Sequence, residues 1–78
     1  ALYPALTGAE NLAFFAELAG QAVDSAQRDA ILARLRFPGD AIDRPAGTYS
    51  KGMRQKLGLA IALMKGAEAI LLDEPLSG

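Results

Sequence analysis

The fold of this chain is decided by residues 49–56, which read Tyr49-Ser50-Lys51-Gly52-Met53-Arg54-Gln55-Lys56. This stretch joins a glycine-containing turn to the longest amphipathic helix in the sequence, predicted from Ser50 to about Lys65. Ser50 is a favourable N-cap, and the unpaired N–H groups of a first helical turn carry partial positive charge. Gly52 lacks a Cβ, so a ligand can approach the backbone there. The pattern predicts a helix N-terminus that binds an anion, with phosphate as its natural ligand.

Two shorter helices are predicted before this stretch. Thr7 and Glu10 have the spacing of a capping box, and apolar residues then recur at helical spacing as far as Gly20, which suits the end of a helix. A second helix is capped by Asp24 or Ser25 and ended by Pro38 with the glycine that follows it. Residues 43–48 are predicted to be a polar connection without periodicity.

A short apolar segment follows the long helix and ends in two acids. Gly66 is a predicted helix stop, and residues 70–72 are apolar on both faces, as in a strand buried in a parallel sheet. Asp73 and Glu74 come at the end of that strand, where adjacent side chains diverge. By themselves such acids also occur where a strand simply enters solvent. Phosphoryl transfer to water, however, needs one group at a metal and one at the attacking water, and this pair could supply both.

Together these two pieces resemble the nucleotide-binding subunit of ATP-binding cassette (ABC) proteins. The family's signature motif, usually Leu-Ser-Gly-Gly-Gln, is followed one helix later by a Walker B strand. Residues 49–53 differ from that motif at three of five positions but keep Ser50 and Gly52, and their form resembles the variant of prokaryotic exporters of drugs, lipids and polysaccharides. Residues 2–12 are similar to the family's stretch after the Q-loop, so the resemblance covers nearly the whole chain. They read Leu2-Tyr3-Pro4-Ala5-Leu6-Thr7-Gly8-Ala9-Glu10-Asn11-Leu12.

The resemblance implies an α/β fold, a P-loop NTPase of the ABC type, for a parent protein of which these 78 residues are an internal piece. The piece itself is expected to be mostly α-helical, with about three helices and one buried strand at its C-terminal end. Residues 1–48 would belong to the α-helical subdomain and residues 49–66 to the signature motif and its helix. Residues 67–78 would form the Walker B strand and the start of the following loop.

The resemblance also implies the roles of the site residues toward ATP and Mg²⁺. Glu74 would be the catalytic residue that orients or deprotonates the attacking water, and Asp73 would hold the Mg²⁺ shell, through water. The residues that would face ATP held by the opposite subunit of a head-to-tail dimer are Ser50, Lys51, Gly52 and Met53. The sequence contains no Gly-x-x-x-x-Gly-Lys-Ser/Thr loop, so residues 1–78 alone are not expected to hydrolyse ATP.

The implied partners are a second nucleotide-binding subunit, in a homodimer or pseudo-dimer, and a transmembrane permease. They would place the protein in the cytoplasm, on the inner face of the cell membrane. The first two helices would lie near the permease. Aromatic residues at helical spacing are usually buried, so core packing is expected for Phe14 and Phe15, with a partner-facing patch as the alternative for Phe14.

The leading function is therefore ATP hydrolysis that powers an ABC transporter, namely a prokaryotic exporter. One alternative is a nontransport ABC ATPase that regulates ribosomes or nucleic acid, and another is an inert structural helical fragment. The full reading frame separates them, because two cassettes with a charged linker favour the regulator, and a Walker A motif before Ala1 argues against the inert fragment.

Composition narrows the remaining classes. A net charge of −1 with 51% hydrophobic residues is typical of a soluble globular protein and gives no basic footprint for direct binding of nucleic acid. The chain has no Cys and no His, which excludes disulfides, thiolate metal sites and Ser-His or Cys-His nucleophiles within it. The longest apolar run, Leu57 to Met64, is far shorter than the ~20 residues of a membrane span.

Overall fold

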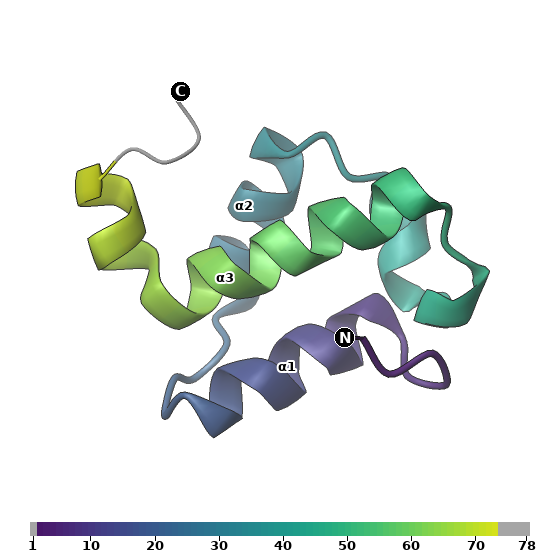
Figure 1. Ribbon diagram of the computed structural model, residues 1–78, viewed down its shortest axis with the longest axis horizontal. Coiled ribbons are helices and arrows are strands. Elements are labelled where there is room, and N and C mark those ends of the chain that lie inside the picture. The colour runs from purple at the N-terminus through teal and green to yellow at the C-terminus, as the bar shows by residue number, and fades with distance from the viewer. Residues whose placement is uncertain (1, 74–78) are drawn as a thin grey trace.

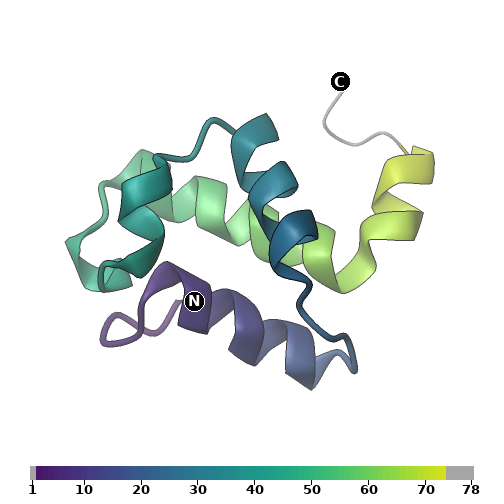
Figure 2. The ribbon, with the colours of Figure 1, turned by 180° about the vertical axis from the view of Figure 1, so that it is seen from behind.

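The computed structural model describes the backbone of residues 2–73 and the side chains of residues 2–65. Its helices are α1 (Gly8–Leu18), α2 (Ser25–Arg34) and α3 (Lys51–Asp73), with two short 3-10 helices, η1 (Gly39–Asp43) and η2 (Ala46–Thr48), between α2 and α3. Both α1 and α2 pack against α3, which crosses the molecule as its central helix (Figure 1). Seen from behind, α2 crosses α3, and α1 lies below α3 in the view (Figure 2). The predicted set of three helices is confirmed.

Helix α1 begins and ends where the sequence predicts. The Thr7 hydroxyl accepts a hydrogen bond from the Glu10 amide at 3.0 Å, and the Glu10 carboxylate accepts one from the Thr7 amide at 2.8 Å. These two bonds are the predicted capping box. At the other end Gly20 has a φ of 76°, which a residue without a Cβ adopts at no steric cost.

Helix α2 is capped by the first of the two predicted residues. The Asp24 carboxylate accepts a hydrogen bond from the Ala26 amide at 3.2 Å. After the helix ends at Arg34, Arg36 takes a positive φ of 58° and the Phe37 amide donates to the Leu32 carbonyl at 2.9 Å. This turn directs the Phe37 ring into the core, where it is buried.

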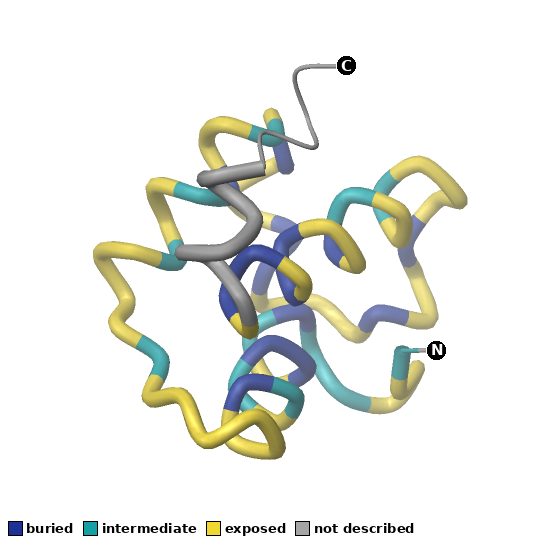
Figure 3. The backbone as a smooth tube through the Cα atoms, turned by 60° about the vertical axis from the view of Figure 1, so that its left-hand side comes forward, coloured by how far each residue is buried: buried dark blue, intermediate teal, exposed yellow. Residues whose placement is uncertain are grey.

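The core forms where the inner faces of the helices meet. Buried positions, dark blue in Figure 3, lie on the sides of α1 and α3 that face one another and on the η1 and η2 segments. Leu12 of α1 and Leu57 of α3 have no exposed surface, and burying a leucine contributes roughly 1.5–3 kcal/mol. The residues of this cluster are Leu12, Leu32, Phe37, Ala41, Ile42, Ala46, Tyr49, Leu57, Ala60, Ile61 and Met64.

The connection before α3 is more ordered than its sequence indicates. Residues 43–48 were expected to be a polar loop, but they contain the end of η1 and all of η2. The Ala46 amide donates to the Leu6 carbonyl at 2.8 Å, and the Gly47 amide donates to the Pro4 carbonyl at 3.0 Å. The order therefore comes from residues about forty positions away, which helical periodicity cannot detect.

The end of α3 also differs from the prediction. The helix continues through Gly66 as far as Asp73, so the stop at Gly66 and the strand over residues 70–72 are wrong for this structure. A buried strand needs neighbouring strands for its hydrogen bonds, and none lies within residues 2–73. Alanine, leucine and glutamate, which dominate residues 67–72, are good helix formers, so the backbone bonds to itself instead. Glu74, Pro75 and the predicted loop after them lie outside the described residues.

Across residues 2–73, no helix combines the length and the apolar character that crossing a bilayer requires.

Candidate functional site

Ser50 and the first residues of α3, Lys51 to Met53, form the start of this helix, which is called the mouth below. The Ser50 hydroxyl accepts a hydrogen bond from the Met53 amide at 3.1 Å, and the Ser50 carbonyl accepts one from the Arg54 amide at 2.9 Å. Ser50 is therefore the N-cap that the sequence predicts. Lys51 and Gly52 are exposed beside it, and a Cβ built on Gly52 would meet nothing within 4 Å. Of the four residues that the sequence assigns to a phosphate, Ser50, Lys51 and Gly52 are exposed here, whereas Met53 is partly buried against the core.

Tyr49, directly before the mouth, is held by all three of its hydrogen-bonding groups. Its hydroxyl donates to the Ala41 carbonyl at 2.6 Å, and its amide donates to the Ala46 carbonyl at 3.1 Å. Its own carbonyl accepts from Arg54 Nη1 at 3.1 Å. The ring is 4% exposed and lies edge-on to Phe37, with the ring centroids 5.5 Å apart. The backbone therefore enters the mouth from a fixed point in the core.

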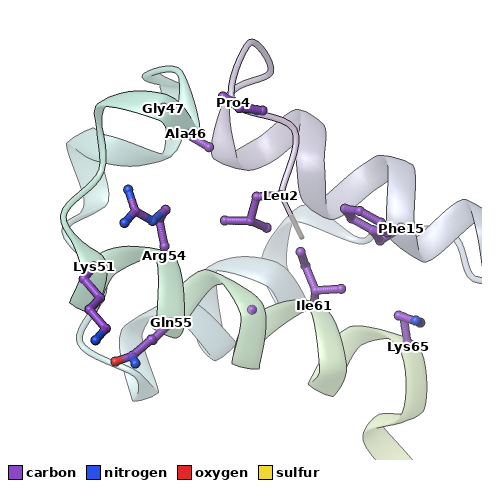
Figure 4. A pocket seen from close by; sticks show the side chains of 11 residues that line it. Leu2, Pro4, Phe15, Ala46, Gly47, Lys51, Arg54, Gln55, Ile61 and Lys65 are labelled. Carbon is purple, nitrogen blue, oxygen red and sulfur yellow. The ribbon is translucent and has the colours of Figure 1, made fainter.

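A groove of about 830 Å³ runs from the mouth along α3, between this helix and the N-terminal loop. Leu2, Phe15 and Ile61 supply apolar walls, while Arg54 rises from α3 toward the segment that carries Ala46 (Figure 4). The lining residues that the structure describes include three cations and no acid, so the groove is positive. The complete lining is Leu2, Pro4, Phe15, Ala46, Gly47, Lys51, Arg54, Gln55, Gly58, Ile61 and Lys65.

The backbone of Asp73, the one predicted carboxylate residue within the described backbone, lies far from the mouth. Asp73 is the last residue of α3 and Lys51 is the first, so about 33 Å of helix separates them at ~1.5 Å per residue. Glu74 is outside the described residues. One chain therefore does not bring Ser50 and Asp73 to one phosphate group.

The described residues would supply at most part of a magnesium site. Among the described residues, no group of three His, Cys, Asp or Glu side chains is placed to hold a metal. Mg²⁺ characteristically uses one or two carboxylates together with water and substrate phosphates, so a single aspartate at residue 73 is compatible with it. The remaining ligands would have to come from ATP, from water and from other segments.

Asn11 is a structural residue that the sequence reasoning missed. It has no exposed surface, and its amide nitrogen donates to the carbonyls of Tyr3 (3.1 Å), Leu6 (3.3 Å) and Thr7 (2.9 Å). Its Oδ1 accepts from the Tyr3 amide at 2.9 Å. Asn11 therefore fixes the N-terminal loop, residues 2–7, against α1. The available signal was a polar residue next to Leu12 on the apolar side of the helix.

The same loop is joined to the segment before the mouth. Besides the backbone bonds from Ala46 to Leu6 and from Gly47 to Pro4, an isolated antiparallel bridge pairs Thr7 with Pro45. A Cβ on Gly47 would come within 3.1 Å of Pro4 Cβ, so these segments pack closely. The beginning of the chain and the approach to α3 form one bonded unit.

An exposed apolar patch on the outer side of α1 is formed by Tyr3, Phe14 and Leu18. These side chains are 49%, 39% and 69% exposed. Tyr3 and Phe14 meet edge-on with centroids 5.1 Å apart, and Phe15 lies beneath them, partly buried against the core. The expectation of core packing is thus met by Phe15 and is wrong for Phe14. Phe14 faces outward because its direction on α1 points away from α3.

Comparison with known proteins gives one family. A family model described as "ABC transporter" matches residues 1–77. The chain is 44% identical over 80 residues to ATP-binding cassette sub-family A member 7 of Mus musculus and 36% identical over 80 residues to ABC transporter A family member 5 of Arabidopsis thaliana. It is 46% identical over 78 residues to the taurine import ATP-binding protein TauB of Mesorhizobium japonicum.

These matches cover 100%, 99% and 97% of this chain but only 4%, 8% and 30% of the respective relatives. The chain therefore spans less than a third of the length of the curated relatives named here. No solved structure matches it.

Proposed function

This chain belongs to the ABC transporter family, and on that premise we propose that it is part of an ATP-hydrolysing nucleotide-binding subunit that dimerises on ATP and powers transport. The observation that carries the proposal is the separation of the two predicted half-sites. The mouth at Ser50 and the backbone of Asp73 lie at opposite ends of α3, about 33 Å apart along the helix. A dimer of head-to-tail subunits unites the mouth of one chain with the carboxylates of the other.

In this arrangement the mouth contacts the γ-phosphate of the opposite subunit's ATP. The exposed first turn, the open space at Gly52 and the positive side chain of Lys51 all suit an anion. One anion at a helix N-terminus is worth only about 0.3–2 kcal/mol. That energy biases the closure of a dimer but does not hold ATP unaided, so the main phosphate-binding loop belongs to other parts of the subunit.

The two acids divide the chemistry between them. Mg²⁺, when bound, neutralises charge on the β- and γ-phosphates. Asp73 would hold the ion through its water shell, and Glu74 would accept a proton from the attacking water or orient it. Both roles are assigned to carboxylates that are adjacent in sequence.

The permease is the proposed partner of the exposed apolar patch. Tyr3, Phe14 and Leu18 are large and exposed, and Phe14 contacts Tyr3 of the loop that Asn11 fixes, as an apolar contact surface requires. Contact with a permease places the subunit at the inner face of the membrane. For direction we propose export from a prokaryotic cell, of drugs, lipids or polysaccharides, because Lys51 and Met53 give the motif its exporter-like form. The import named for the taurine relative is the competing direction.

The test replaces the two acids in the full-length protein. Glu74→Gln removes the base but keeps the size of the side chain, so turnover should fall by about 10²-fold or more while ATP binding and ATP-dependent dimerisation survive. Asp73→Asn should instead weaken the dependence of ATP binding on Mg²⁺. Glu17→Gln, at an exposed position on α1, is the matched control and should hydrolyse ATP normally. Wild-type turnover in both acid variants contradicts the proposal.

A further inference from the structure

The contact between Gly8 and Tyr49 joins the first residue of α1 to the last residue before the mouth. A Cβ built on Gly8 would collide with the Tyr49 hydroxyl, and it would lie 3.0 Å from Ile42 Cδ1. The space that any other residue would need at position 8 is thus already filled by the tyrosine. Gly8 has an ordinary helical backbone, so this close approach, and not its conformation, is the reason for a glycine.

The Tyr49 hydroxyl that fills this space also makes the hydrogen bond to the Ala41 carbonyl, at 2.6 Å. Burial raises the pKa of Tyr49, outweighing the opposite effect of the Gly8 backbone, so the hydroxyl keeps its proton as a donor at neutral pH. The hydroxyl therefore joins η1, α1 and the approach to α3 at one atom. Ser50 follows Tyr49 directly, and any displacement of Tyr49 moves the cap of α3.

We propose that Tyr49 is a positioning residue for the nucleotide-facing mouth, and that Gly8 is required because the Tyr49 hydroxyl occupies the place of its side chain. The proposal rests on the function proposed above, in which the mouth closes on the opposite subunit's ATP. Neither residue touches the nucleotide. Both residues act on the position of Ser50 and of the first-turn amides. They therefore determine how well the mouth fits a phosphate that the other subunit already holds.

Two substitutions act on the same atom in different ways. Tyr49→Phe removes the hydroxyl and its hydrogen bond but keeps the ring on Phe37. Gly8→Ala adds a methyl group that pushes the hydroxyl away from the Ala41 carbonyl. In the double variant the methyl group occupies the space that the hydroxyl has left, while the end of the flexible Ile42 side chain can turn aside. Tyr49→Phe should therefore relieve the effect of Gly8→Ala.

The experiment uses the full-length protein with Glu74→Gln in every variant, so that ATP-dependent dimers accumulate without hydrolysis. Light scattering measures the ATP concentration for half-maximal dimerisation. A separate titration at low protein concentration measures ATP binding to the monomer, and thermal unfolding checks the fold. Gly39→Ala is the matched control, because a Cβ there would meet nothing within 4 Å.

We expect Tyr49→Phe to raise the half-maximal ATP concentration for dimerisation about 2- to 10-fold, the range of one lost hydrogen bond. Gly8→Ala should raise it further, and the double variant should return to the level of Tyr49→Phe. Monomer binding of ATP and the behaviour of Gly39→Ala should stay at the level of the Glu74→Gln parent. A purely structural role would lower the unfolding temperature and leave dimerisation unchanged.

Unchanged dimerisation in Tyr49→Phe therefore overturns the positioning role. If Gly8→Ala does not fold, Tyr49→Phe and the double variant still test the proposal. It requires that both variants fold and that both dimerise at the same ATP concentration. A Glu74→Gln parent that shows no ATP-dependent dimerisation overturns the proposed function, and this inference with it.

Discussion

Asn11 and Phe14 lie one turn apart on α1 and reverse the usual distribution of polar and apolar side chains. Asn11 has no exposed surface and makes four hydrogen bonds to the N-terminal loop, whereas Phe14 is 39% exposed on the outer face. A buried amide is stable only when its hydrogen bonds are made, and an exposed aromatic group on a surface contributes little to the fold. The comparison teaches that Asn11 maintains the structure, whereas Phe14 is available to a partner.

The larger effect on stability should come from Asn11. Asn11→Leu keeps a side chain branched at the same carbon but removes the four side-chain hydrogen bonds to residues 3, 6 and 7, so the local free energy of unfolding should fall by about 2–4 kcal/mol. Hydrogen exchange of the α1 amides in the full-length protein measures this loss. Gln27→Leu, the same kind of change at an exposed site on α2, is the control. Equal protection of the α1 amides in the two variants would contradict the structural role of Asn11.

Phe14 should show the opposite behaviour, with a small effect on stability and a large effect on transport. Phe14→Glu loses two edge-on aromatic contacts, so the change in unfolding free energy should stay within about 1–2 kcal/mol. Coupling to the permease should be lost while basal ATPase activity remains. Phe14→Leu keeps an apolar surface and should retain most of the transport rate. Unfolding of Phe14→Glu, or transport at the wild-type rate, would remove the partner-facing role.

The two ends of α3 show how far sequence reasoning reaches. The beginning of the helix is determined locally, because Ser50 bonds to an amide three residues away, and this cap was predicted correctly. A strand over residues 70–72 would need neighbouring strands to pair with, and residues 2–73 contain none, so the helix continues to Asp73. The prediction of a strand assumed neighbours that the described residues do not contain.

The contacts of Tyr49 escaped prediction for a related reason. The sequence places Tyr49 in the motif, but its hydroxyl bonds to Ala41 and fills the space beside Gly8, forty-one residues earlier in the chain. No periodic pattern relates these positions. Gly8 was accounted for only as part of a capping box, and its role in close packing needed the structure. The roles of Asp73 and Glu74 remain predictions from the sequence and the family.

The central claim is that the mouth of one chain serves the ATP of its neighbour, and a mixed dimer tests it most directly. One subunit carries Ser50→Arg, which blocks the mouth, and the other carries Glu74→Gln, which removes the base; two different tags allow the mixed species to be purified. If each site combines Ser50 of one chain with Glu74 of the other, both lesions fall in one site and the second site stays intact. We predict that this mixed dimer traps hydrolysed nucleotide in a single turnover. Trapping no greater than in either single-variant homodimer would contradict the claim.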